Sequence, residues 1–259
     1  MSFTQLSYEI DGPVAVIGLN RPAKRNALGE TLIAELHAAV LRAGREARVG
    51  VLHGHGDHFS AGLDLAEQLE RTPADSIANS RLWHRVFDDI ERGPIPFVAA
   101  LQGGVIGGGL ELAAATHVRV ADASAFFALP EGQRGIFVGG GGSVRVARLM
   151  SATRMTDLML TGRSLTAEEG ERFNLVHYIV AAGQALDRAR DIARRIANNP
   201  PMSNFAVTNG LSRIQDLSHD DGLFFESLMV AVTQASGDTQ DRLRDFLEKK
   251  AARVGPRRD

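Results

Sequence analysis

The sequence contains no cysteine among its 259 residues, so disulfide bonds are excluded. Neither sign of charge is in excess, because 29 lysine and arginine residues face 31 aspartate and glutamate residues, for a formal net charge of −2. Without a basic surplus, we expect no nucleic-acid partner. The first residues lack a cationic segment followed by an apolar one, so we expect no signal peptide and a cytoplasmic protein.

A long apolar segment is also missing, although residues 94–118 contain only Glu111 and His117 as ionisable groups. Glycine or proline occupies seven of these positions, which interrupts any helix of the ~20 apolar residues that a membrane span requires. We therefore expect no membrane association. The stretch predicts instead a buried strand, a glycine-rich turn and a buried helix that carries Glu111.

The pattern that is present is that of an α/β protein, because short β-branched runs alternate with stretches of helical periodicity. Strands are predicted over residues 6–10, 14–19, 49–53, 97–101 and 118–121. Helices are predicted over residues 30–46, 72–90 and 110–116, and the second of these is expected to turn inward Ile77, Leu82, Val86 and Ile90. After about residue 180 only helices are predicted, over residues 182–198, 203–216, 223–235 and 238–254.

Common ligand-binding motifs do not fit this chain. The glycine runs at residues 103–109 and 139–142 match neither the dinucleotide fingerprint nor the phosphate-binding loop of nucleotide hydrolases. Three histidines and an aspartate crowd residues 53–58, and His53 and His55 could share a strand face as metal ligands. Because the interspersed glycines indicate a solvated turn and no distant ligand cluster is evident, we expect no metal site.

Three motifs remain, and they follow one another in a fixed order. They are residues 59–65 (FSAGLDL), residues 103–112 (GGVIGGGLEL), and residues 129–131 (LPE) with Gly135 and residues 139–142 behind them. With residues 21–22 and 26–28 before them and residues 160–163 and 167–170 after them, they resemble the crotonase superfamily of enoyl-CoA hydratases and isomerases. The resemblance runs over nearly the whole chain. It implies an α/β spiral of ββα units followed by an all-helical C-terminal trimerisation region.

The resemblance also implies an oxyanion hole and two catalytic carboxylates. A thioester enolate is stabilised by rigid N–H donors aimed at one point, and the implied donors are the N–H groups of Leu63 and Gly108. The alternative is that these glycine-rich turns only pack a helix against a strand. The implied catalytic positions carry Glu111, a lone charge in an apolar helix, and Glu131, which on sequence alone is an ordinary first-turn residue after proline.

With both glutamates present, the resemblance implies hydration of a 2-enoyl-CoA to a 3-hydroxyacyl-CoA. Glu111 would deprotonate the attacking water and Glu131 would protonate the α-carbon of the enolate, with coenzyme A as part of the substrate and no other cofactor. The alternatives are an enoyl-CoA delta-isomerase, although specialised isomerases often lack the first glutamate, and a hydratase-lyase of aryl-propenoyl thioesters. A non-catalytic member that binds a CoA ester or RNA is disfavoured by the intact glutamates and by the net charge.

Coenzyme A binding is implied for residues in the first quarter of the chain and for two residues near its end. These residues are Lys24, Arg25, Ala27, Ala61, Asp64, Leu65, Phe246 and Lys249. Lys24 and Arg25 alternatively form a solvated basic turn. Phe246 and Lys249, three residues apart on one helix face, match family positions that reach the coenzyme of a neighbouring subunit, but a plain amphipathic helix explains them equally well.

The acyl pocket is expected along the helix over residues 72–90, with Trp83 and Phe87 on one face and His84 beside them. The alternative is that these aromatic residues belong to the core. A rigid tryptophan wall would favour short or aryl-substituted acyl groups. Residues 132–134 and 136–138 depart from the family pattern. The resemblance implies that this loop helps to shape the same pocket, so the departure leaves the identity of the acyl group open.

Residues 1–195 are expected to form the spiral core with the coenzyme A site and the active site, and residues 196–259 to form the oligomerisation region. The C-terminal helices carry apolar side chains that the α/β part is not expected to cover, namely Leu223, Leu228, Val232, Phe246 and Leu247. We therefore expect a homotrimer, or a homohexamer built from two trimers.

Overall fold

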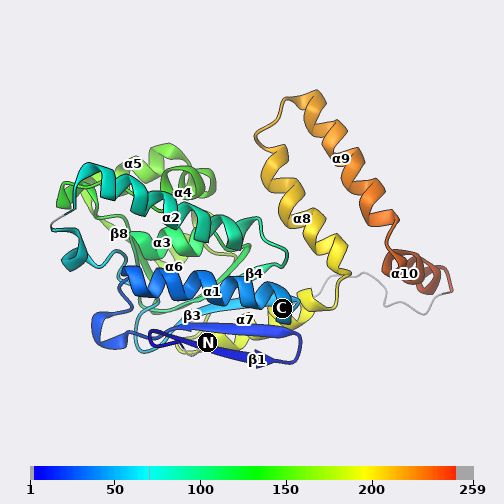
Figure 1. Cartoon of the computed structure of the whole chain (residues 1–259), viewed down its shortest axis with the longest axis horizontal. Coiled ribbons are helices and arrows are strands. Elements are labelled where there is room, and N and C mark those ends of the chain that lie inside the picture. The colour runs from blue at the N-terminus through cyan, green and yellow to red at the C-terminus, as the bar shows by residue number, and fades with distance from the viewer. Residues whose placement is uncertain (1–2, 70, 249–259) are drawn as a thin grey trace. The chain divides into compact units, whose positions relative to one another are not determined.

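The computed structural model describes residues 3–69 and 71–248, and contacts within the chain divide it into two compact units (Figure 1). The first unit ends at Ala197 and the second begins at Asn198. Within the described residues, all strands belong to the first unit, and the second unit is helical.

A six-stranded sheet forms the body of the first unit, in the order β1-β2-β3-β4-β6-β9. Its strands are β1 (Leu6–Asp11), β2 (Val14–Leu19), β3 (Val49–Gly54), β4 (Phe97–Leu101), β6 (Val118–Asp122) and β9 (Tyr178–Val180). β1 and β2 form the predicted antiparallel hairpin, and all other neighbours pair in parallel. Every residue of β2, β3 and β4 is buried, as expected for parallel strands that are covered on both faces.

Helices cover both faces of this sheet. Because successive residues of a strand point to opposite sides, neighbouring residues of β2 pack against different helices. On one face, α1 (Glu30–Glu46) shares a core cluster with Ile17 of β2. On the other face, α7 (Ala185–Ala197) shares a separate cluster with Val16. The predicted α/β architecture is confirmed, and α1 has the predicted bounds.

A second sheet of three short strands, in the order β5-β7-β8, supports the site described below. The strands are β5 (Gly104–Ile106), β7 (Phe126–Ala128) and β8 (Ser164–Thr166). Four short helices accompany them, namely α3 (Gly108–Ala114), α4 (Gly142–Met150), α5 (Ala152–Thr161) and α6 (Ala167–Arg172). The predicted helix that carries Glu111 is present as α3, and the glycine-rich motif before it contains the short strand β5, which was not predicted.

α2 (Pro73–Glu91) begins at a capping box in which Thr72 and Asp75 exchange hydrogen bonds. The prediction that Ile77 faces inward is wrong, because Ile77 is 64% exposed. At about 100° per residue, Ile77 lies roughly 120° around the helix from Trp83, so the two cannot share a face. The buried side of α2 consists of Trp83, Val86, Phe87 and Ile90.

The second unit consists of α8 (Pro201–Ile214), α9 (His219–Gln234) and α10 (Gly237–Leu247), with α9 in contact with both other helices. Much of its apolar surface is exposed. Five predicted interface residues are each at least 41% exposed, namely Leu223, Leu228, Val232, Phe246 and Leu247. In the part of the chain that the structure describes, no helix combines the length and the apolar character that a membrane span requires.

Candidate active site

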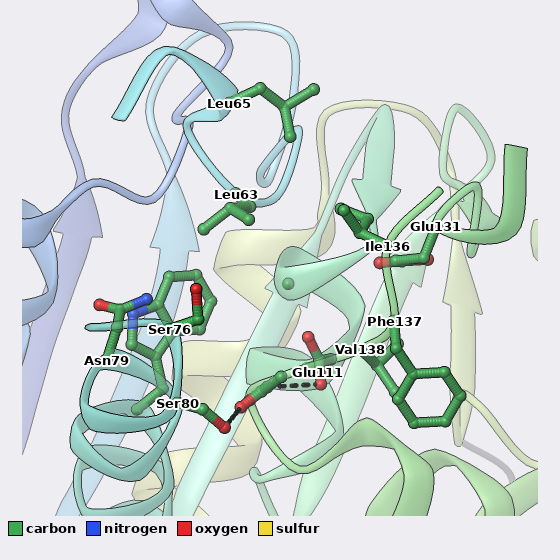
Figure 2. A pocket seen from close by; sticks show the side chains of 14 residues that line it. Leu63, Leu65, Ser76, Asn79, Ser80, Glu111, Glu131, Ile136, Phe137 and Val138 are labelled. Carbon is green, nitrogen blue, oxygen red and sulfur yellow. Dashed lines mark hydrogen bonds between the residues drawn. The ribbon is translucent and has the colours of Figure 1, made fainter. Parts of the chain in front are cut away.

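A cavity of about 360 Å³ opens in the first unit where α2, the start of α3 and the segment that follows Glu131 meet (Figure 2). Side chains of α2 stand on one side of it and those of residues 136–138 on the other, with Glu111 between them. The lining residues are Leu63, Leu65, Ser76, Asn79, Ser80, Trp83, Gly108, Glu111, Glu131, Ile136, Phe137, Val138, Gly139 and Gly140. The structure thus brings into one cavity six of the predicted site residues, namely Leu63, Leu65, Trp83, Gly108, Glu111 and Glu131.

Glu111 lies in the first turn of α3 and is 3% exposed. Its Oε1 atom accepts hydrogen bonds from the N–H groups of Gly140 at 2.8 Å and Gly142 at 2.7 Å. Burial raises the pKa of Glu111, while these N–H groups and the positive charge of Arg145 oppose the rise. The carboxylate is therefore shielded from water, and backbone N–H groups stabilise its negative charge.

Glu131 follows β7 and directly precedes the short 3₁₀ helix η3 (Gly132–Arg134). It is buried, and its Oε2 atom has no hydrogen-bond partner among the described residues. Burial and the nearby charge of Glu111 raise the pKa of Glu131 to about 7. A protonated Glu131 is thus available as a proton donor near neutral pH.

Gly107, at the start of α3, allows the two carboxylates to share the cavity. Its φ is 52°, and a Cβ atom at this position would lie 2.6 Å from Oε1 of Glu131. The N–H group of Gly107 donates to the carbonyl of Ala128 at 2.9 Å, which joins the start of α3 to β7. Any other residue would be strained at this φ and would collide with Glu131.

Two backbone N–H groups at the cavity, those of Leu63 and Gly108, donate to no acceptor within residues 3–69 and 71–248. The two lie close together. A Cβ atom on Gly108 would be 3.5 Å from the nitrogen of Leu63, and one on Gly62 would be 3.0 Å from the nitrogen of Gly108. Two neighbouring donors without acceptors can stabilise an oxygen atom that gains negative charge during a reaction.

The two segments expected to bind coenzyme A, residues 24–27 and 61–65, run side by side. The carbonyl of Arg25, whose φ is 50°, accepts a hydrogen bond from the N–H group of Ala61 at 2.8 Å. Leu28 and Leu63 form a parallel β-bridge. Arg25 is exposed and Leu65 is 40% exposed, so the paired segments reach the surface next to the cavity.

Asp64 joins these two segments through ion pairs. Its Oδ2 atom accepts hydrogen bonds from Nη2 of Arg21 at 3.0 Å and from Nζ of Lys24 at 3.3 Å. Arg21 also donates to the carbonyl of Ala27 at 2.6 Å. Burial would raise the pKa of Asp64, but hydrogen bonds from the two cations hold it below its ordinary value. Lys24 is the more exposed of the two cations.

Of the three residues predicted to line the acyl pocket, Trp83 lines the cavity and His84 and Phe87 do not. The ring of Trp83 packs against that of Phe87, with centroids 5.7 Å apart, and a Cβ atom on Gly108 would lie 2.8 Å from its Cζ3 atom. Trp83 therefore stands directly beside one of the two N–H donors. Phe87 is fully buried behind it, and His84, about 100° further around α2, is exposed.

Three polar residues of α2 also line the cavity and were not predicted, namely Ser76, Asn79 and Ser80. The hydroxyl of Ser80 donates to the carbonyl of Gly139 at 2.6 Å and so connects α2 to the opposite wall (Figure 2). These residues precede Trp83 by seven, four and three positions, so helical spacing from Trp83 was the signal that could have identified them.

The two remaining coenzyme A candidates are Phe246 and Lys249. Phe246 belongs to the second unit, where it is 62% exposed. Lys249 lies outside the described residues.

Two of the histidines in residues 53–58, His53 and His55, lie together at the end of β3. Nε2 of His55 and the hydroxyl of Ser7 are 2.7 Å apart, and the rings of His53 and His55 are in contact. Burial and the neighbouring His55 lower the pKa of His53 to about 4. Across the described ranges, no three histidine, aspartate or glutamate side chains are grouped so that they could hold a metal ion.

Comparison with known proteins places these features in a family. A model of the enoyl-CoA hydratase/isomerase family matches residues 9–255. Enoyl-CoA hydratase EchA19 of Mycobacterium tuberculosis is 31% identical over 245 residues, 93% of this chain and 92% of that protein. The short-chain-enoyl-CoA hydratase of Clostridium acetobutylicum is 30% identical over 253 residues, 96% of this chain and 97% of that protein.

The fold agrees with the sequence match. A crystal structure from Rhodopseudomonas palustris, provisionally named an enoyl-CoA hydratase, is 50% identical, covers 95% of each chain and gives a TM-score of 0.92. The predicted crotonase fold is thereby confirmed. The chain belongs to the enoyl-CoA hydratase/isomerase family.

Proposed function

We propose that this protein hydrates the double bond of a 2-enoyl-CoA to give a 3-hydroxyacyl-CoA. The observation that carries the proposal is a pair of buried glutamates in unequal environments at one cavity. Glu111 accepts hydrogen bonds from two N–H groups, whereas Oε2 of Glu131 has no hydrogen-bond partner among the described residues. The hydratase names of its relatives support the same reaction.

The N–H groups of Leu63 and Gly108 receive the thioester oxygen. When the oxygen of water bonds to the β-carbon, the electrons of the double bond move towards that thioester oxygen and an enolate forms. The two donors stabilise the negative charge most strongly at this stage, which lowers the barrier for the addition.

The two glutamates move the protons. Oε1 of Glu111 is held by two N–H groups, so Oε2 accepts a proton from the attacking water. Glu131 gives its proton to the α-carbon, so that one hydroxyl and one hydrogen have been added across the double bond. Glu111 is then protonated and Glu131 ionised, and proton exchange through solvent restores the starting state. Because the pKa of Glu131 is about 7, it can hold the proton that this step requires near neutral pH.

Coenzyme A binds, as part of the substrate, along the paired segments of the first unit, and no other cofactor takes part. Lys24 and Arg25 meet its phosphates, and the adenine lies against Ala61, Asp64 and Leu65, with Ala27 contributing backbone. Exposure of Arg25 and Leu65 next to the cavity supports this placement.

The acyl group enters along α2, and Trp83 limits its length. The ring of Trp83 is packed against Phe87 and lies next to Gly108, so it forms a rigid wall close to the reacting carbons. Such a wall favours short or aryl-substituted acyl groups over long linear ones. The name of the short-chain relative from Clostridium supports this preference.

Residues 1–195 carry the active site, and residues 196–259 assemble the protein into a homotrimer or a hexamer of two trimers. The exposed apolar side chains of the second unit support this assignment. In the assembly, Phe246 and Lys249 reach the coenzyme of a neighbouring subunit. We place the enzyme in the cytoplasm, in the metabolism of fatty acyl or related acyl thioesters.

A spectrophotometric screen tests the proposed reaction. Purified protein is incubated with a panel of short, long and aryl-substituted 2-enoyl-CoAs and, separately, with a 3-enoyl-CoA, and the absorbance of the conjugated thioester is followed. Loss of this absorbance, with a 3-hydroxyacyl-CoA as the product, is the expected result. An increase of absorbance from a 3-enoyl-CoA, without hydration of any 2-enoyl-CoA, would identify a delta-isomerase instead. Release of an aryl aldehyde would identify a hydratase-lyase.

A further inference from the structure

The two glutamates need opposite protonation states for the proposed reaction, yet both are buried. An acid–base pair of this kind works when the surroundings separate the two pKa values. Here the difference lies in the partners, because Glu111 receives two N–H hydrogen bonds whereas Oε2 of Glu131 receives none from the described chain. Whatever holds the segment of Gly140 and Gly142 in place therefore decides which glutamate is the base.

One buried side chain holds that segment, and it does not line the cavity. Arg145 of α4 is 8% exposed, and its Nη1 atom donates to the carbonyl of Gly140 at 3.1 Å. Its other nitrogens bind the last turns of α2, with Nε 2.7 Å from Oε2 of Glu91 and Nη2 bonded to Oδ1 of Asp88. The guanidinium group thus joins the glycine segment to a fixed helix.

Gly140 is consequently held through both of its backbone polar groups. Its carbonyl accepts a hydrogen bond from Arg145, and its N–H group donates to Glu111. The neighbouring Gly141 has a φ of 97°, and a Cβ atom there would lie 2.3 Å from Nη1 of Arg145. The absence of a side chain at Gly141 gives the guanidinium group the space it occupies.

We propose that Arg145 is the positioning residue that makes Glu111 the base of the pair, because it holds Gly140 in the orientation that directs N–H groups at that carboxylate. This role rests on the proposed hydration. Arg145 never touches the substrate, and its three-way hydrogen bonding is a geometry that the planar guanidinium group supports and a lysine cannot reproduce.

The charge of Arg145 acts in the same direction as its hydrogen bonds, because it lowers the pKa of Glu111 against the effect of burial. Other charged or titratable groups around this site are Glu131, which faces Glu111 across the cavity, Asp88 and Glu91, which partly neutralise Arg145, and His84, whose ring lies near Gly141. Loss of Arg145 therefore moves the pKa of Glu111 further upwards.

Four variants separate the charge of Arg145 from its hydrogen bonds. Arg145→Gln removes both. Arg145→Lys keeps the charge but loses the three-way hydrogen bonding of the guanidinium group. Glu91→Gln removes one of the carboxylates that bind Arg145 and leaves the arginine in place. Arg148→Gln is the matched control, since Arg148 lies three residues further along the same helix and is exposed. For each variant, kcat and KM are measured as a function of pH with an enoyl-CoA that the wild type hydrates.

For Arg145→Gln we expect the acidic limb of the kcat/KM profile to move up by about one pH unit, because an opposite charge near the base is lost. We expect its kcat to fall roughly ten- to a hundredfold through misplacement of the base, with KM nearly unchanged because Arg145 does not line the cavity. Arg145→Lys and Glu91→Gln should lower kcat while the acidic limb stays near that of the wild type. Arg148→Gln should match the wild type.

A second readout needs no turnover. Infrared titration of the protonated carboxyl groups, with Glu111→Gln as the reference, gives the pKa of Glu111 in the wild type and in Arg145→Gln. A higher pKa of Glu111 in the variant supports the positioning role, whether or not the wild type hydrates any of the enoyl-CoAs. Absence of hydration by the wild type would reject the proposed reaction but not the positioning role. Folded Arg145→Gln with an unchanged titration and an unchanged pH profile would overturn the role. If Arg145→Gln does not fold, a kcat for Arg145→Lys within twofold of the wild type would also overturn it.

Discussion

Replacement of Glu131 by glutamine should lower activity and at the same time change how stability depends on pH. Burial and the charge of Glu111 raise the pKa of Glu131 from 4.5 to about 7 in the folded protein. A carboxyl group with a raised folded-state pKa stabilises the fold least at high pH, because the unfolded chain ionises first. Relative to its value at high pH, the free energy of unfolding is therefore greatest below pH 4.5, and this contribution of Glu131 is lost as the pH rises from 4.5 through 7.

Between pH 5 and pH 8, this single group should cost the wild type about 2.5 kcal/mol of unfolding free energy. Glu131→Gln carries no such group, so the difference in stability between the two proteins should change by that amount over the same range. Any fixed cost of the buried amide is present at both pH values and cancels. For a protein of this size, the change corresponds to roughly 5 to 10 °C in the difference between the two Tm values.

The assay is thermal unfolding of both proteins at pH 5 and pH 8, at one protein concentration, with hydration activity measured on the same samples. The activity of Glu131→Gln should be at least ~10²-fold lower, as for the loss of one general acid. Glu168→Gln is the control, since Glu168 is exposed and backbone and Thr166 hydrogen bonds lower its pKa; the group is ionised in both states at pH 5 and pH 8, so its Tm difference should change little between them. A Tm difference for Glu131→Gln that is the same at both pH values would refute the account of Glu131.

Three further predictions concern the other parts of the site and the assembly. Glu111→Gln should lower kcat at least ~10²-fold while calorimetry shows CoA-ester binding retained, because the glutamine carbonyl can still accept the two N–H hydrogen bonds; wild-type hydration rates would remove Glu111 from the mechanism. Trp83→Ala should change the ratio of kcat/KM between short and long enoyl-CoAs by more than about twofold, within the ~1–3 kcal/mol that pocket contacts discriminate; an unchanged ratio would make Trp83 a core residue. Sedimentation at micromolar concentration should show a trimer or a hexamer, and a stable monomer would reject the role of Phe246 and Lys249 at a neighbouring site.

The elements that could be predicted are those whose residues show a complete periodic pattern. α1 was predicted with its bounds, since six buried residues repeat at helical spacing over 17 residues. The hairpin of β1 and β2 was visible from its apolar runs on either side of a turn. β5, β7 and β8 were not predicted, because each has three residues and alternation cannot be recognised over so short a length.

The same contrast holds within the site. Glu111 was identifiable from sequence because it is a lone charge in an apolar, glycine-rich stretch. Arg145 was not, because its partners Asp88 and Glu91 lie more than fifty residues away in the sequence and are brought to it only by the fold. His84 illustrates the opposite case, since its neighbour Trp83 lines the cavity but one step along the helix turns His84 to the surface.

The most direct test of hydration is the fate of water in the product. The protein is incubated with crotonyl-CoA in water enriched in ¹⁸O, and the CoA esters are analysed by mass spectrometry, with the Glu111→Gln and Glu131→Gln variants in parallel. The account predicts a 3-hydroxyacyl-CoA that carries one ¹⁸O atom in its hydroxyl group, formed by the wild type and at least ~10²-fold more slowly by either variant. Recovery of crotonyl-CoA or an isomer without added water would contradict it.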